Sequence, residues 1–287
     1  AEQVGRALGE LPAAVYDSAD RWDPEWPVLE KIAALPRGAD VLLTLALALS
    51  DYQLGVGGAT AYWAAAPSLL ERFPPDDAGQ VYEFMFELMQ RPVAARLGEN
   101  KLRRVKRLVD SEVPQLTSGG VESVDAVALW PALAKAASAD GDRNAKTIVF
   151  ALKTLGLLHL AATGRRLALP EQLPIPVDLR VARVSLSAGL IGPPPGVSVL
   201  EAIENVEPLI ESNRVQMIEA WTEAAANVGL SAAEIDSLIW QLGEPLYAHR
   251  HSRADAEAAL QAHLQLLGAP GPAARAAAHE LTQYLEG

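Results

Sequence analysis

The chain has 287 residues, half of them apolar, which is enough to bury one large core or two smaller lobes. It has no cysteine, which excludes disulfides, thiolate zinc sites and cysteine-held iron–sulfur clusters. The formal charge of -12 argues against a nucleic-acid partner, because proteins that bind phosphate backbones usually carry a basic surface. The five histidines show no ligand spacing, and the most apolar window, 41–49, is too short to span a bilayer. We therefore expect no metal or other cofactor, and a cytoplasmic protein.

Apolar residues recur with a helical period along nearly the whole chain, and no segment shows the alternation typical of a strand. The sequence therefore predicts an all-α protein of two helical lobes with a cleft between them. Prolines and glycines separate the helices, most firmly at 192–196 and 270–272. In chain order we expect helices over 26–35, 40–53, 59–73, 77–90, 99–108, 123–137, 145–161, 179–188, 199–223 and 232–242, and two more near the C-terminus.

The helix expected over 99–108 contains the one dense cluster of positive charge in the sequence. Five of seven consecutive residues are basic: Lys101, Arg103, Arg104, Lys106 and Arg107. Taken alone, the cluster fits either a solvated helix face or a surface that binds phosphate groups.

A short polar loop joins the helix expected over 123–137 to the helix that starts near Ala145, so that a helix–hairpin–helix element covers about 123–161. Asn144 is suited to cap the second helix. Lys146 then falls in the first turn, where the partial positive charge of the helix terminus disfavours an ammonium ion. An amine that attacks carbon has to be unprotonated, so this position favours a nucleophile. The alternative is a lysine at the exposed end of a surface helix.

Lys146, Phe150 and Lys153 are spaced so that they share one face of this helix, while the apolar residues between them supply a packing surface. An aromatic ring between two lysines suits a pocket in which a flat base stacks on the ring and an amine reaches its polar edge. A solvent-facing stripe with one phenylalanine is the alternative.

Asp178 follows an extended approach that Pro174 and Pro176 stiffen, and it is placed to cap the helix expected over 179–188. Capping by itself explains an aspartate at this position. The same carboxylate has little rotamer freedom there, and we expect its outer oxygen to be available to a substrate.

The run Pro-Val-Asp-Leu-Arg-Val-Ala-Arg-Val at 176–184 resembles the proline/valine–aspartate signature of the helix-hairpin-helix DNA glycosylases. In most of that superfamily the lysine lies about twenty residues before the aspartate, in a glycine-rich hairpin. Here the hairpin lacks that motif, and the lysine at 146 and the aspartate at 178 are 32 positions apart. Both departures are similar to one branch, the archaeal 8-oxoguanine DNA glycosylase/lyases. Segments 51–54, 57–63, 99–108 and 144–153 also resemble that branch, so the resemblance runs from about residue 20 to about residue 245.

The resemblance implies the helix-hairpin-helix glycosylase fold, with 1–287 as a single catalytic unit of two helical subdomains. It implies Lys146 as nucleophile and Asp178 as its carboxylate partner, and it assigns the basic helix to the DNA backbone. Asp236 and Trp240 share a face of a helix that a capping-box pattern at 231–234 opens. Glu25 is the nearest candidate for a glutamine that the family places in the pocket. The implied lining of the base pocket is Trp63, Phe150, Lys153, Asp236 and Trp240.

The implied activity is base excision repair by a bifunctional DNA N-glycosylase and AP lyase, which removes 8-oxoguanine through a Schiff base and cuts the strand by β-elimination. We expect a monomer acting on double-stranded or single-stranded DNA. Three alternatives stay open at this point: a monofunctional glycosylase that uses the aspartate and water, a non-catalytic DNA-binding helical protein, and a helical scaffold for protein partners.

Overall fold

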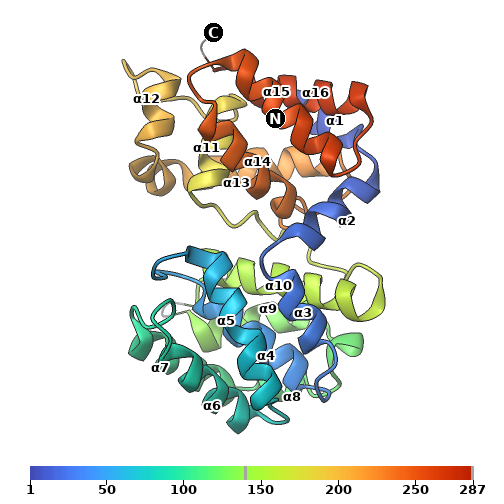
Figure 1. Cartoon of the computed structure of the whole chain (residues 1–287), viewed down its shortest axis with the longest axis vertical. Helices are drawn as coiled ribbons and strands as arrows, with labels where there is room; N and C mark the ends of the chain where they lie inside the picture. The colour runs from blue at the N-terminus through green and yellow to red at the C-terminus, as the bar shows by residue number, and fades with distance from the viewer. Residues whose placement is uncertain (139–140, 286–287) are drawn as a thin grey trace. The chain divides into compact units, whose positions relative to one another are not determined.

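The computed structural model describes residues 1–138 and 141–285, and every regular element in that part of the chain is a helix (Figure 1). The prediction of an all-α protein is confirmed. The elements are α1 Glu2–Gly9, α2 Ala13–Trp22, α3 Trp26–Ile32, α4 Ala39–Ser50, α5 Gly58–Arg72, α6 Ala78–Met89, α7 Gly98–Val109, α8 Val113–Leu116, the 3-10 helix η1 Val121–Ser123, α9 Ala126–Ala137, α10 Lys146–Thr163, α11 Leu179–Ser187, α12 Val199–Glu204, α13 Glu207–Ala226, α14 Asp236–Ala248, α15 Arg253–Leu266 and α16 Gly271–Thr282.

The chain folds into two compact units. Unit 1 combines Ala1–Asp23 with Glu171–Gly287, and unit 2 is the continuous stretch Pro24–Pro170. The N-terminal helices α1 and α2 therefore belong with the second half of the chain: α1 packs on α13 and α16, and α2 packs on α14.

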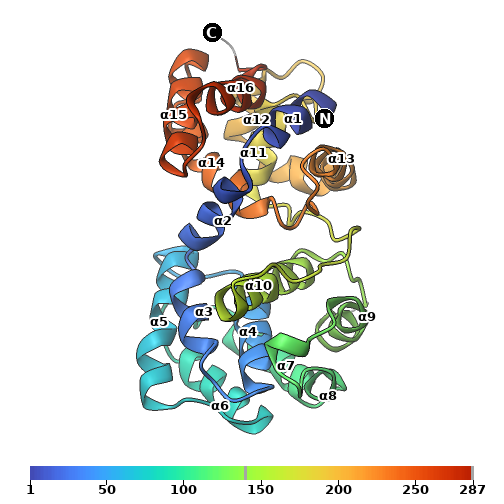
Figure 2. The ribbon, with the colours of Figure 1, turned by 90° about the vertical axis from the view of Figure 1, so that its right-hand side faces the viewer.

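Unit 2 is built around α10, which packs against α3, α4, α9 and η1 (Figure 2). All twelve residues of α4 are buried, so this helix fills the centre of the unit beside α10. By length and composition alone α10 would be long enough to cross a membrane, but 61% of it is buried within the protein. That burial is typical of a core helix in a folded unit.

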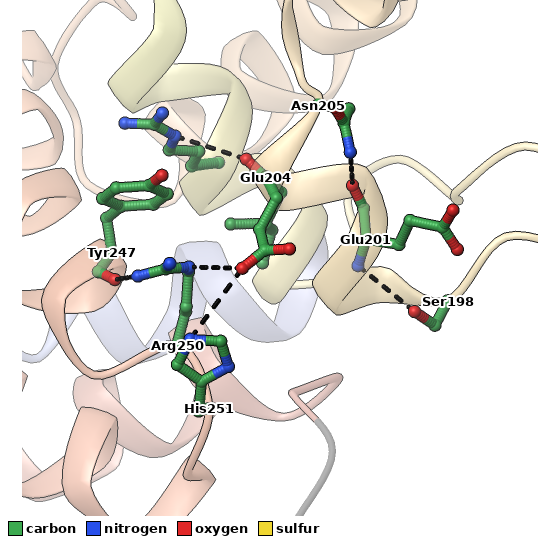
Figure 3. A network of polar contacts seen from close by, with 9 residues as sticks. Ser198, Glu201, Glu204, Asn205, Tyr247, Arg250 and His251 are labelled. Carbon is green, nitrogen blue, oxygen red and sulfur yellow. Dashed lines mark hydrogen bonds and ion pairs between the residues drawn. The ribbon is translucent and has the colours of Figure 1, made fainter.

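Unit 1 is organised by α11 and α14, which pack on each other, with α15 and α16 completing the layer. The buried Trp221 indole of α13 donates a hydrogen bond to Ser185 Oγ of α11 at 2.8 Å. A polar network holds α12 to the segment after α14: Glu204 accepts from Arg250 Nε at 3.1 Å and lies 3.8 Å from His251 Nε2 (Figure 3). The Tyr247 ring lies between two guanidinium groups. Its centroid is 3.6 Å from Cζ of Arg183 and 4.2 Å from Cζ of Arg250.

Several helix boundaries differ from the prediction. The helix expected over 199–223 is two helices, α12 and α13, because Pro208 lies in the first turn of α13, where a proline lacking its N–H starts a helix and would break a continuous one. The capping box at 231–234 forms a turn ahead of the helix: Glu234 Oε2 accepts from the backbone N–H of Ser231 at 2.8 Å, but α14 begins only at Asp236. Helices α1, α2 and α8 are absent from the prediction.

Gly243 of α14 provides a test of the packing between α11 and α14. A Cβ atom at this position would lie 2.5 Å from Cβ of Arg180 and 3.1 Å from its Cα. Because backbone has to move to relieve that contact, we expect Gly243→Ala to lower the free energy of unfolding by about 1–3 kcal/mol in urea denaturation. The matched control is Gly192→Ala, since a Cβ there meets nothing within 4 Å. Equal stability of the two variants would contradict the close approach.

Candidate active site

Lys146 is the first residue of α10 and is exposed, so the prediction that it lies in the first turn is confirmed. The predicted cap is wrong: Ala145 occupies the cap position and makes no side-chain hydrogen bond. The reason lies one turn earlier, where Asp142 Oδ1 accepts from the backbone N–H of Asn144 at 2.8 Å. This local turn places Asn144 before the helix and delays its start.

Phe150 and Lys153 follow on the same helix. Phe150 is half-buried, and Lys153 is buried with its Nζ 5.7 Å from the centroid of the Phe150 ring. A cation near an aromatic face gains from the ring quadrupole, so these two side chains support each other's position. Unit 2 therefore has an exposed amine, a partly accessible ring and a buried amine along one helix.

Asp51 is the charged residue of unit 2 that sequence reasoning missed as part of the site. It follows directly after α4, and its Oδ2 accepts a hydrogen bond from Trp63 Nε1 at 2.8 Å. Burial raises the pKa of this carboxyl, while the Trp63 hydrogen bond and the positive charges of Lys146, Lys101 and Lys153 act in the opposite direction. The signal in the sequence is a carboxylate directly after the strongly apolar run 41–49.

Arg104 links the basic helix α7 to the start of α10. Its Nη1 donates to the Leu49 carbonyl at 3.0 Å and to Thr147 Oγ1 at 3.3 Å, and its guanidinium lies 4.9 Å from the centroid of the Tyr52 ring. A surface hollow of about 550 Å³ adjoins this contact. Its lining is Tyr52, Asn100, Arg103, Arg104, Lys106 and Arg107.

In unit 1, Asp178 caps α11 as predicted. Its Oδ1 accepts from the backbone N–H groups of Arg180 and Val181 at 2.9 and 3.0 Å. The outer oxygen, Oδ2, accepts from Trp240 Nε1 at 3.1 Å and retains a second lone pair, so its availability to a substrate stays a prediction. Both oxygens are thus held, and the carboxylate is fixed in one orientation.

Trp240 is half-buried, and its ring is covered on one side by the Arg180 guanidinium at 3.8 Å. Glu244, one turn further along α14, holds Arg180 through an ion pair of 3.2 Å. Asp236 is buried in the first turn of α14, four residues before Trp240, so the two lie on one helix as predicted. Unit 1 therefore presents a fixed carboxylate, an indole and a buried aspartate along α11 and α14.

A family profile described as "AGOG: N-glycosylase/DNA lyase" matches residues 5–274. The chain belongs to the AGOG family. Three relatives bear the name N-glycosylase/DNA lyase. One from Pyrobaculum aerophilum is 38% identical over 101 residues, which is 35% of each chain. The relative from Methanopyrus kandleri is 29% identical, and the match covers 76% of this chain and 79% of that protein. The relative from Aeropyrum pernix is 26% identical, and the match covers 84% of this chain and 82% of that protein.

The AGOG assignment agrees with a solved structure, the 8-oxoguanine DNA glycosylase Pa-AGOG of Pyrobaculum aerophilum complexed with 8-oxoguanosine. The match has a TM-score of 0.65 at 22% identity and covers 92% of this chain and 94% of that one. At this identity the likeness shows the fold, which confirms the predicted fold class. The chain is an N-glycosylase/DNA lyase of the AGOG family.

In addition to Lys153 and Asp236, three further residues that the sequence of this AGOG chain predicted for the site are buried. Trp63 is fully buried with its N–H directed to Asp51, so in this structure it does not offer a stacking face. Glu25 is buried just before α3, where its carbonyl accepts from the N–H groups of Val28 and Leu29. Lys101 is fully buried, which contradicts its placement on a DNA-facing surface.

Lys101 Nζ donates to the Ala94 carbonyl at 3.2 Å and lies 5.3 Å from the centroid of the Tyr52 ring. Lys101 shares a face of α7 with the buried Val105 and Leu108, because the basic run 101–107 winds around the helix. Burial lowers the pKa of Lys101 from its ordinary value of 10.5 to about 8, although Asp51 acts in the opposite direction.

This pKa predicts a pH-dependent stability. Between about pH 8 and 10.5 the unfolded chain binds more protons at Lys101 than the folded chain, so the stability contribution of this lysine rises with pH. We expect the free energy of unfolding to rise by roughly 1–2 kcal/mol, relative to Lys101→Met, between pH 7.5 and 9.5. Urea denaturation at the two pH values measures the difference. A constant difference between the proteins would show that Lys101 titrates as an exposed lysine does.

Proposed function

We propose that this chain removes 8-oxoguanine from DNA and then cuts the strand, with Lys146 as nucleophile and Asp178 as its carboxylate partner. The observation that carries the proposal is an exposed lysine at the first position of α10 in a chain that the AGOG profile matches over residues 5–274. The names of the relatives and of the solved Pa-AGOG protein support the substrate and the two activities.

The reaction begins with extrusion of the damaged nucleotide, because the glycosidic carbon is inaccessible in a stacked duplex. The neutral Lys146 amine forms a bond to C1′ as the bond from C1′ to the base breaks, and the base leaves with a proton. Opening of the sugar ring at the C1′–O4′ bond then gives the imine. The imine acidifies the C2′ proton, and loss of that proton expels the 3′ phosphate by β-elimination.

Asp178 acts in this scheme as a fixed negative charge. Its two oxygens are oriented by the α11 backbone and by Trp240, which leaves the carboxylate no freedom to swing. A preorganised charge of this kind stabilises the positive charge that develops on the sugar, without any cost of reorientation during the step.

Each unit offers groups that suit a base: we propose that Phe150 of unit 2 and Trp240 of unit 1 act as stacking faces, and that Lys153 of unit 2 and Asp236 of unit 1 contact the base edges. Arg180 covers one face of the Trp240 indole, so the base would stack on the other. A buried ammonium and a buried carboxylate discriminate strongly between bases, because a base whose donors and acceptors do not match them forfeits charge-assisted hydrogen bonds in a site that excludes water.

The proposed contact with the DNA backbone is the exposed side of α7. Arg103, Lys106 and Arg107 are exposed, and together with Arg104 they line the hollow next to the start of α10. The net negative charge of the chain does not argue against this contact with DNA. Unit 2 carries sixteen basic and sixteen acidic residues, whereas unit 1 carries eight and twenty, so the whole net charge of -12 belongs to unit 1. We propose action on either single- or double-stranded DNA, as a monomer.

Borohydride trapping tests the nucleophile. With DNA that contains one 8-oxoguanine, reduction of the imine leaves a covalent protein–DNA adduct, which we expect from the native protein and not from Lys146→Gln. The matched control is Lys135→Gln, which removes an exposed lysine of the same unit and should trap as the native protein does. Base release at the native rate by Lys146→Gln would indicate a monofunctional glycosylase instead.

Salt dependence tests the basic helix. For duplex DNA, the logarithm of the binding constant falls linearly with the logarithm of the salt concentration, and each phosphate contact adds about 0.9 to the steepness of that line. We expect the double variant Arg103→Gln/Lys106→Gln to reduce that slope by about 1–2 with little change in base preference. Arg37→Gln, an exposed arginine paired with Glu122, serves as the control and should keep the native slope. A native slope in the double variant would remove α7 from the proposed DNA contact.

A further inference from the structure

The side chain of Arg180 lies across one face of the Trp240 ring, where α11 packs on α14. Its Cζ is 3.8 Å from the centroid of the ring, and its Nη2 pairs with Glu244 at 3.2 Å. Gly243 permits this close approach, since a Cβ atom at that position would lie 2.5 Å from Cβ of Arg180. An ion pair and close packing therefore hold the guanidinium over the indole.

The same arginine and tryptophan also hold the carboxylate of Asp178. The backbone N–H of Arg180 donates to Asp178 Oδ1 at 2.9 Å, and Trp240 Nε1 donates to Oδ2 at 3.1 Å. The three residues thus form a closed loop of contacts, which runs from carboxylate to backbone, from guanidinium to indole face, and from indole N–H back to the carboxylate. Because the loop closes, the plane of the indole determines the direction of the hydrogen bond that reaches Oδ2.

A second stack of an arginine on an aromatic ring joins α11 and α14 further along the two helices. Cζ of Arg183 lies 3.6 Å from the centroid of the Tyr247 ring. The other face of that ring is next to Arg250, which donates to Glu204, so this stack belongs to the polar network at α12 (Figure 3). Arg183 therefore provides a matched control for Arg180, with the same chemistry and a different connection.

A guanidinium is well suited to keep an indole in place. It is flat, it stacks on aromatic rings, and the quadrupole of the ring attracts its charge. This attraction disfavours other rotamers of Trp240, in which the hydrogen bond to Asp178 would be lost. A carboxylate that is already oriented stabilises a developing positive charge without any cost of reorientation.

We propose that Arg180 is a positioning residue for the reaction: it holds the indole of Trp240 in one plane, and through the indole N–H it orients the carboxylate of Asp178. This inference rests on the proposed function, in which Trp240 stacks on the base and Asp178 stabilises the positive charge on the sugar. Arg180 acts through these two side chains and not by contact with the substrate.

A double-mutant cycle tests whether Arg180 acts through Trp240. Arg180→Met keeps the length of the side chain without its charge or its flat end, and we expect single-turnover excision of 8-oxoguanine to slow by about three- to tenfold. Trp240→Phe keeps a ring and removes the N–H donor. In that background Arg180→Met should slow excision by about twofold at most, because the bond to Asp178 is already lost. Equal slowing in the two backgrounds would contradict the proposal.

Three further measurements exclude other roles for Arg180. Arg183→Met removes the matched stack between the same helices and should excise at the native rate; slowing equal to that of Arg180→Met would indicate helix packing alone. Glu244→Gln releases the guanidinium without altering the ring, and it should slow excision in the same direction; a native rate would count against the proposal. Arg180→Met should keep the native salt dependence of DNA binding, because a slope lower by about 0.9 would identify Arg180 as a phosphate contact instead.

A measurement without DNA separates this inference from the proposed function. In ¹H–¹⁵N NMR spectra, Trp240→Phe identifies the indole signal of Trp240. We expect the indole N–H hydrogen to exchange with water about three- to tenfold faster in Arg180→Met, and at the native rate in Arg183→Met. If the native protein excises no 8-oxoguanine, the proposed function fails, while this exchange still decides whether Arg180 holds Trp240. An unchanged exchange rate in Arg180→Met would overturn the positioning role.

Discussion

The burial of α10 in unit 2 determines where the amines of Lys146 and Lys153 can lie. Ile148, Val149, Leu152 and Leu155 are fully buried, and this fixes the rotation of the helix about its axis. Turning the helix to hide Lys146 would expose these side chains, at a cost of about 1.5–3 kcal/mol for each of the larger ones. The position of Lys146 at the helix end is thus maintained by apolar residues that take no part in chemistry.

The second constraint is how the carboxylates are held. Asp178 is fixed by two backbone N–H groups and an indole, and Asp51 by a second indole. In each case a tryptophan N–H orients one carboxylate oxygen, so each unit contains a tryptophan–aspartate pair. An indole can donate only one hydrogen bond, which means that these rings have committed their polar atom and otherwise act through their faces.

The fold class and the cap of one helix could be predicted from the sequence, because residues close together in the chain determine them. The helical period indicated the all-α class, and the residues Pro176, Val177 and Asp178 were enough to expect the cap of α11. Prediction failed where a competing local turn or a tertiary contact decides. Asn144 has good capping chemistry, but a turn closed by Asp142 moved the helix start. Lys101 is spaced to share a helix face with the apolar Val105 and Leu108, but the groups that make its burial tolerable, the Ala94 carbonyl and the Tyr52 ring, come from outside the helix. Asp51 belongs to the site only because α5, α7 and α10 meet there.

The pairing of Ala1–Asp23 with Glu171–Gly287 has a consequence for how the protein is made. Unit 2 is one uninterrupted stretch, so all of its contacts are available once residue 170 has left the ribosome. Unit 1 completes its packing later, because α1 and α2 pack on α13, α14 and α16, which are translated near the end of the chain. Domains generally fold as units during synthesis, at about 5–20 residues per second. Unit 2, which contains Lys146, is therefore complete first, and for several seconds of translation the two N-terminal helices keep apolar side chains such as Leu8 and Val15 exposed to solvent and to chaperones.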